Sequence, residues 1–262
     1  ANDLFEQLLK KYPNTKYLDF VGARRFVIAK YWLNWYQAEQ PSFYQFNLVD
    51  SKRPTSDPFG HAVRVFDRMR LDDPTGKLAD DATIAAANAH LAAGDYQRAD
   101  QFYTDLRKTF PSSEHQFMAH YLGVKAKLNA NMGPDYAGDT LDEAETLVKQ
   151  TRRQFPNESR QYAQDLERTY RQIRFKQAER EFEMANYYMR RSEYGGARFY
   201  YQRILDDFAD TPFADKAREK IATIADEPAV PPQRFEWLVK LFPDSSADQP
   251  IMATAPSSTT RR

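Results

Sequence analysis

The sequence predicts an all-α protein in which about five helical hairpins of the tetratricopeptide type stack into a right-handed superhelix. Three observations support this fold class. One residue pattern recurs five times at fixed offsets. Between the breaks, apolar residues follow each other at the three- to four-residue steps of a helix rather than at the alternating steps of a strand. Short Gly-containing breaks then separate the first and second helix of a pair, as in a helical repeat array.

The recurring pattern belongs to the second helix of each hairpin. Counted back from a Pro, an Ala stands at minus twelve, a bulky residue at minus eight and usually an apolar residue at minus five. The small Ala lets two helix backbones approach, the bulky residue fills the space towards the next hairpin, and the Pro ends the helix. The copies are Ala1/Phe5/Leu8/Pro13, Ala62/Phe66/Met69/Pro74, Ala99/Tyr103/Leu106/Pro111, the weaker Ala144/Val148/Thr151/Pro156, and Ala197/Tyr201/Ile204 with Ala209 in the Pro place.

The first elements are a helix over 2–12, ended by Pro13, and a long aromatic helix over 16–37. More than one face of the second helix is apolar, so we expect it to be buried on two sides. The alternative is that one side is a ligand groove, with Tyr31, Trp32, Trp35 and Tyr36 as its candidate residues. Residues 38–58 form a Pro-punctuated insertion that is too apolar for a free linker, and we expect it to fold back over the repeats.

The following elements are a helix over 59–73 and hairpins over 78–93/96–110 and 114–132/140–155. Residues 159–191 contain no Gly or Pro, which predicts a single helix of about 33 residues, roughly 50 Å long. It pairs with a second helix that starts after Gly195–Gly196, and a cap-like helix follows over 211–224.

Three regions are expected. The repeat domain covers 1–225, and a Pro-rich extension with a short helix covers 226–243. In that extension, Phe235, Leu238 and Pro243 form a degenerate sixth copy with Pro231 in the Ala place. Residues 244–262 are rich in Ser, Thr, Ala and Pro and are expected to be disordered.

The composition limits the classes of function. Lys plus Arg and Asp plus Glu number 37 each, so no net field favours nucleic acid or an anionic membrane. No apolar run is long enough to span a bilayer. The absence of Cys excludes a disulfide, a thiolate metal site and a Cys nucleophile, and it fits either a reducing compartment or the periplasm.

No sequence motif points to an enzyme, a cofactor or a metal. The chain has no phosphate-binding, dinucleotide-binding or nucleophile-elbow motif. Of the four His residues, His115 and His120 lie five positions apart and do not share a helix face. We therefore expect no catalytic residue, no cofactor and no metal site.

The last hairpin resembles that of the BamD/ComL family of outer-membrane lipoproteins, which have five tetratricopeptide hairpins. The likeness lies in a long helix with a Tyr pair, a basic residue, a short break, and a helix that ends at an aromatic residue and an Asp-Thr turn. These are Tyr187, Tyr188, Arg190, Tyr194, Phe208 and Asp210–Thr211, and the overall likeness covers most of residues 1–225. The extension over 226–243 is not part of the family pattern.

The resemblance implies a non-catalytic periplasmic scaffold of the outer-membrane β-barrel assembly machinery. Such a scaffold binds the barrel insertase and other subunits through its C-terminal repeats, and unfolded outer-membrane proteins in a groove of its N-terminal repeats. The family's lipidated Cys is absent here, and since Ala1 lies within a second helix we expect upstream residues in the natural protein. Membrane contact would be through that lipid anchor alone. The alternatives are a Tol-Pal-associated adaptor of the cell envelope and a cytosolic adaptor for peptide tails.

The hairpin at 182–208 is the candidate partner surface. Its turn gathers four charged side chains and one aromatic side chain, which core packing does not require, and Tyr and Arg are common at the energetic centres of interfaces. The alternative is a solvated turn without a partner. The residues concerned are Arg190, Arg191, Glu193, Tyr194 and Arg198.

Overall fold

The computed structural model describes residues 2–13, 15–39, 46–47, 50, 52–131, 133–134 and 138–231, and its regular secondary structure in that part is entirely helical. The tail at 244–262 and residues 232–243 of the extension lie outside the described residues. The helices are α1 (Asn2–Lys11), α2 (Leu18–Glu39), α3 (Pro58–Asp72), α4 (Ala79–Ala92), α5 (Tyr96–Thr109), α6 (Gln116–Ala130), α7 (Asp139–Gln154), α8 (Pro156–Gln161), α9 (Ala163–Arg190), α10 (Tyr194–Asp207) and α11 (Phe213–Thr223).

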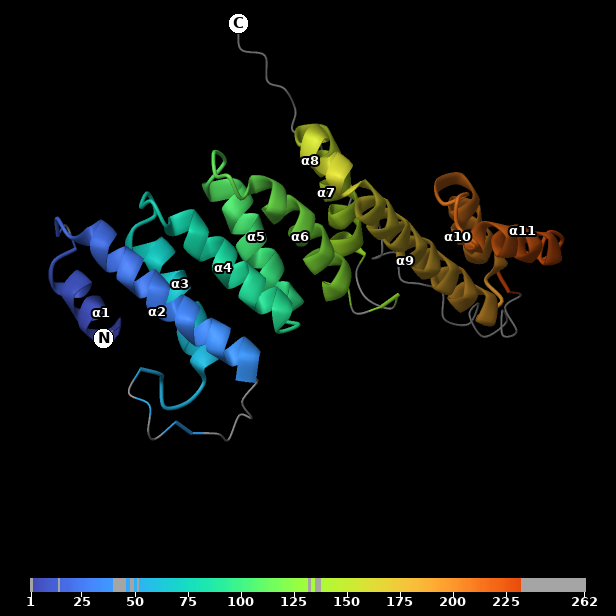
Figure 1. Ribbon diagram of the computed structural model, residues 1–262. Coiled ribbons are helices and arrows are strands. Elements are labelled where there is room, and N and C mark those ends of the chain that lie inside the picture. The colour runs from blue at the N-terminus through green and yellow to red at the C-terminus, as the bar shows by residue number, and fades with distance from the viewer. Residues whose placement is uncertain are drawn as a thin grey trace, which may run out of the picture.

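The helices form an elongated array in which each helix packs mainly against its neighbours in the sequence. Figure 1 shows them following one another from α1 at one end to α11 at the other. The hairpins are α2–α3, α4–α5, α6–α7 and α9–α10, while α1 packs on α2 and α11 on α10. The predicted all-α, tetratricopeptide-like architecture is confirmed.

The core residues are those that the repeated spacing selected. The Ala of each second helix and the bulky residue four positions later are both fully buried, because the two backbones meet at the Ala and the larger side chain fills the seam to the next helix. This holds for Ala62/Phe66, Ala99/Tyr103, Ala144/Val148 and Ala197/Tyr201, each at 0% exposure. In the first copy the buried residue is Leu9 rather than the expected Leu8.

Two hairpins each contain an equivalent Tyr–Asn hydrogen bond that the sequence pattern did not predict. The Tyr103 hydroxyl donates to Asn88 Oδ1 over 2.6 Å, and the Tyr201 hydroxyl donates to Asn186 Oδ1 over 2.9 Å. Each pair satisfies the polar end of a buried Tyr, which would otherwise be costly to bury.

The prediction of one continuous helix over 159–191 is wrong. The segment is divided at Tyr162 into the short α8 and the 28-residue α9. The reason is tertiary: the Tyr162 ring lies 5.3 Å from the Phe117 ring and 4.7 Å from the Tyr121 ring. A straight helix is interrupted so that this aromatic side chain can pack on α6.

The insertion folds back over the repeats in its described part, as expected. Trp32 Nε1 donates to the carbonyl oxygen of Lys52 over 2.9 Å. The Arg53 guanidinium lies 4.3 Å from the centre of the Trp35 ring, a cation–π distance. The segment therefore covers part of the aromatic surface of α2.

Candidate protein interface

The turn between α9 and α10 presents charge and aromatic surface at one end of the hairpin. Arg190 and Arg191 are exposed, whereas Glu193 and Tyr194 are half-buried. Arg191 Nε donates to Glu193 Oε1 over 2.7 Å, and its Nη1 donates to the Tyr187 hydroxyl over 3.1 Å. The hydrogen bond to Glu193 raises the pKa of Arg191, so the guanidinium stays cationic.

Arg198 has a different position from the other predicted turn residues. Its Nη1 donates to the carbonyl oxygens of Ile224, over 2.8 Å, and Glu227, over 3.0 Å. The backbone N–H of Gly195 donates to the carbonyl oxygen of Ala229 over 2.9 Å. We call residues 224–231 the strap, because these bonds hold them over the start of α10. Arg198 secures the strap, so four of the five predicted residues remain at the turn.

A row of four aromatic rings runs from this turn on to α10, and sequence reasoning did not select it as a site. Tyr187 meets Tyr188 edge-on at 5.4 Å, Tyr188 stacks on Tyr200 at 5.4 Å, and Tyr200 meets Phe199 edge-on at 5.3 Å. Tyr187 is 43% exposed and Phe199 59%. The two adjacent aromatic pairs in the sequence were the signal that could have found this row.

Gly196 makes room for the row. A Cβ at this position would lie 2.7 Å from Cδ1 of the Tyr188 ring, closer than real Cβ contacts allow. Only Gly therefore lets the ring lie flat against α10.

The four candidate groove residues on α2 do not share one open surface. Tyr31 is 44% exposed, Trp32 is buried, and Trp35 lies beneath Arg53. Tyr36 packs on Phe59 with 5.2 Å between ring centres.

The expected two-sided burial of α2 is wrong. Its second apolar face is exposed, because no described helix packs there. We use the name α2 row for this face together with Tyr17, which directly precedes the helix; its residues are Tyr17, Phe20, Val27 and Tyr31.

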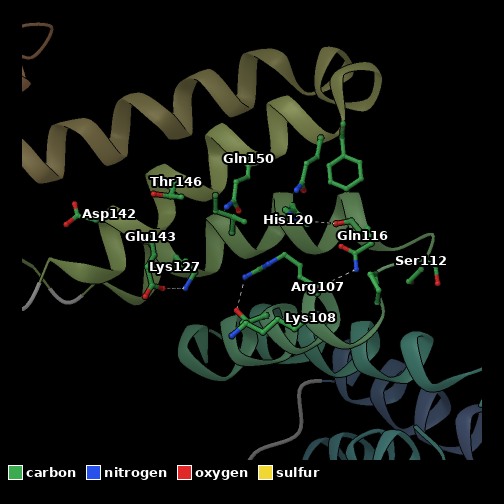
Figure 2. Close-up of a pocket in the computed structure, with 16 residues that line it drawn as sticks. Arg107, Lys108, Ser112, Gln116, His120, Lys127, Asp142, Glu143, Thr146 and Gln150 are labelled. Atoms are coloured by element: carbon green, nitrogen blue, oxygen red, sulfur yellow. Dashed lines mark hydrogen bonds and ion pairs between the residues drawn. The ribbon is translucent and has the colours of Figure 1, made fainter. Parts of the chain in front are cut away.

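A polar cavity of about 930 Å³ lies between α5, α6 and α7 (Figure 2). Arg107 Nη1 donates to the carbonyl oxygen of Ala119 over 2.9 Å, and Gly123 leaves the space that its guanidinium occupies. Lys127 pairs with Asp100 and Glu143. Arg107 and Lys127 are thus engaged within the protein, whereas Lys108 on the cavity wall is exposed.

The described residues offer no metal site and no bilayer-spanning helix. No group of three or more His, Cys, Asp or Glu side chains in that part is placed to hold a metal ion. None of the described helices combines the length and the apolarity needed to cross a bilayer. The described surface exposes aromatic side chains beside Arg side chains on packed helices. Aromatic and Arg side chains are the residue types enriched at the energetic centres of protein interfaces.

The fold is that of a helical-repeat protein, with exposed aromatic and Arg side chains on its packed hairpins. A family model described as YfiO, outer membrane lipoprotein, matches residues 50–227, more than half of the chain. The chain therefore belongs to this outer membrane lipoprotein family, which confirms the resemblance of its last hairpin to BamD/ComL. Membership also supports an outer-membrane-associated location. No curated protein matches the chain.

Proposed function

We propose that the protein is a non-catalytic scaffold of the machinery that inserts β-barrel proteins into the outer membrane, held at the periplasmic face by a lipid anchor. The observation that carries the proposal is the membership of residues 50–227 in an outer membrane lipoprotein family, joined to a repeat fold whose last hairpin exposes Arg and Tyr side chains. A cytosolic adaptor role has no such support.

The turn between α9 and α10 binds the barrel insertase in this proposal. Arg190 and Arg191 supply positive charge. Tyr187, before them in α9, and Tyr194, at the start of α10, supply aromatic surface on either side of the turn. Tyr and Arg bind well because each combines apolar area with hydrogen-bonding groups at a moderate entropic cost. Other subunits of the machinery would contact neighbouring surfaces of the array.

The α2 row receives unfolded outer-membrane proteins. Phe20, Val27 and Tyr31 are exposed on the same side of one helix, and the Arg24 guanidinium lies 5.2 Å from the centre of the Phe20 ring. An exposed apolar face of this kind is a recognised mark of an interaction site, and it suits the apolar side chains of an unfolded β-strand.

The test is a pull-down of the insertase from a detergent extract of outer membranes, with the full chain as bait. The test variant is Arg190→Glu with Arg191→Glu, and the control is Arg218→Glu with Lys220→Glu on the exposed face of α11. Both variants change the charge by the same amount, and neither touches the strap. Circular dichroism establishes that each variant is folded.

We expect the turn variant to lose the insertase and the α11 variant to retain it. Equal retention by both folded variants would rule out the turn as the docking site. Absence of the insertase from the pull-down with the parent chain would contradict the scaffold role itself.

A further inference from the structure

The cavity between α5, α6 and α7 has two cations on its α5 wall that meet no carboxylate. Figure 2 shows Arg107 and Lys108 on this wall. Arg107 Nη1 donates to the Ala119 carbonyl oxygen over 2.9 Å, and its Nη2 donates to the Thr104 hydroxyl over 2.7 Å. Both acceptors are neutral, and within the described part of the chain no carboxylate forms an ion pair with Arg107 or with the exposed Lys108.

The position of the Arg107 guanidinium is fixed by the fold. A Cβ on Gly123 would collide with Arg107 Nη1, so only Gly leaves room for the group in this place. Burial lowers the pKa of Arg107, because a charged group loses favourable hydration when it is buried. Two of its five N–H groups are used in the bonds above, and the others remain for a ligand. An anion bound here would offset the cost of burying the charge.

The charges further along the cavity have the opposite sign. Lys127 Nζ lies 2.8 Å from Asp100 Oδ2 and 2.5 Å from Glu143 Oε2, so one ammonium group meets two carboxylates. Asp142 also lines the cavity and is exposed, and Figure 2 shows it together with Glu143 on one side of Arg107. These carboxylates repel a second negative charge on a ligand. The cavity therefore favours a singly charged carboxylate over a phosphate group.

The α7 wall of the cavity is polar and neutral. Thr146, Gln150 and Gln154 line it, and hydroxyl and amide groups both donate and accept hydrogen bonds, as the backbone of a peptide requires. Burial lowers the pKa of His120, so this side chain adds no positive charge at neutral pH. The volume of about 930 Å³ exceeds what one carboxylate needs and lies within the range of ligand sites, about 300–1,000 Å³.

We propose that this cavity binds an acidic segment of a partner protein, with one Asp or Glu carboxylate on Arg107 and Lys108 and the adjoining peptide units on the α7 wall. The site is separate from the α9–α10 turn and from the α2 row. It therefore goes beyond the scaffold function proposed above, and its test can fail or succeed independently of the pull-down of the insertase.

The experiment is a titration of the isotope-labelled full chain followed by nuclear magnetic resonance. The probe is the peptide acetyl-Gly-Glu-Gly-amide, and the matched neutral peptide is acetyl-Gly-Gln-Gly-amide. Acetate and inorganic phosphate are titrated separately. The Nε–H signal of Arg107, assigned by its loss in Arg107→Gln, reports contact with the guanidinium. The backbone N–H signal of Gln150 reports binding in every variant.

Three variants each remove one positive charge. Arg107→Gln and Lys108→Gln alter the α5 wall. Arg153→Gln is the matched control, because Arg153 is exposed on α7 and lies outside the cavity lining. Circular dichroism establishes that each variant is folded. Lys108 is exposed, so Lys108→Gln keeps the test decisive if Arg107→Gln does not fold.

We expect the Glu peptide to shift the Arg107 Nε–H signal in a saturable manner. Arg107→Gln should weaken its binding about tenfold, which corresponds to about 1.4 kcal/mol. Lys108→Gln should weaken it about threefold, as suits an exposed cation, and Arg153→Gln should leave it unchanged. The Gln peptide and acetate should each bind about tenfold more weakly than the Glu peptide, since each lacks one of the two recognised groups.

Four results would overturn the proposal. Equal binding of the Glu and Gln peptides would mean that the cavity does not recognise a carboxylate. Acetate binding as tightly as the Glu peptide would reduce the site to one for a bare anion. Tighter binding of phosphate would assign the cavity to a phosphate group. An unshifted Arg107 Nε–H signal, or unchanged binding in folded Lys108→Gln, would remove the α5 wall from the site.

Discussion

Substitution of Gly196 by Ala tests whether the aromatic row depends on a missing side chain. The new Cβ would meet Cδ1, Cγ and Cε1 of Tyr188 at 2.7, 2.9 and 3.1 Å. Ala stabilises a helix by about 1 kcal/mol over Gly. Against this, overpacking costs about 1–3 kcal/mol, and loss of the Tyr188–Tyr200 stack costs about 0.5–1.5 kcal/mol. These contributions together give a net destabilisation of about 0.5–3.5 kcal/mol, and we expect a value near the middle of that range, about 2 kcal/mol.

Gly22 on α2 is the matched control for this prediction. A Cβ there would meet no described atom within 4 Å, so Gly22→Ala should stabilise the protein by about 1 kcal/mol through helix propensity alone. The assay is urea unfolding followed by far-UV circular dichroism, with near-UV circular dichroism as the reporter of Tyr packing. If Gly196→Ala stabilised the protein as much as Gly22→Ala, the assigned role of Gly196 would be wrong.

Three further predictions follow from the hairpin geometry. Ser192 has φ of 60° at the place where Gly94 has φ of 77° in the α4–α5 turn, so Ser192→Gly should raise stability by about 1 kcal/mol; a lower melting temperature would contradict this. Asn186→Ala should lower the free energy of unfolding in urea by about 1–3 kcal/mol, because it leaves the buried Tyr201 hydroxyl without its partner. Adding Tyr201→Phe should recover part of this loss. If Asn186→Ala were as stable as the parent chain, the pairing would be refuted. Burial lowers the pKa of His90, so the folded state resists protonation of this imidazole. The stability that neutral His90 contributes is therefore present above pH about 6.5 and is lost as the pH falls below that value. His90→Gln should reduce the difference in unfolding free energy between pH 8 and pH 5, and an unchanged difference would contradict the assignment.

The repeat fold could be predicted because its code is local. An Ala and a bulky residue four positions apart lie on one helix face whatever their partners are, so their burial follows from spacing alone. The break at Tyr162 could not be predicted in this way, because it depends on the Phe117 and Tyr121 rings of a distant helix. Local propensity favours a continuous helix there, and tertiary packing overrides it.

The candidate interface was predicted only in part, for the same physical reason. A charged, aromatic turn can be located from its sequence, and Arg190 and Arg191 do lie exposed there. The role of Arg198 depends on carbonyl oxygens 26 and 29 residues away, which no spacing rule indicates. Phe199 resembles a core residue by type, and only its position on the outer side of α10 makes it a surface residue.

Photo-crosslinking in living cells is the measurement that tests the scaffold role most directly. A photoreactive amino acid is introduced at Arg190 on the α9–α10 turn, and in a separate chain at Arg218 on α11, both of which are exposed. The proposed function predicts a crosslink to the barrel insertase from position 190 and little or none from position 218. Crosslinks of equal strength from both positions, or none from position 190 in a folded and correctly located chain, would contradict it.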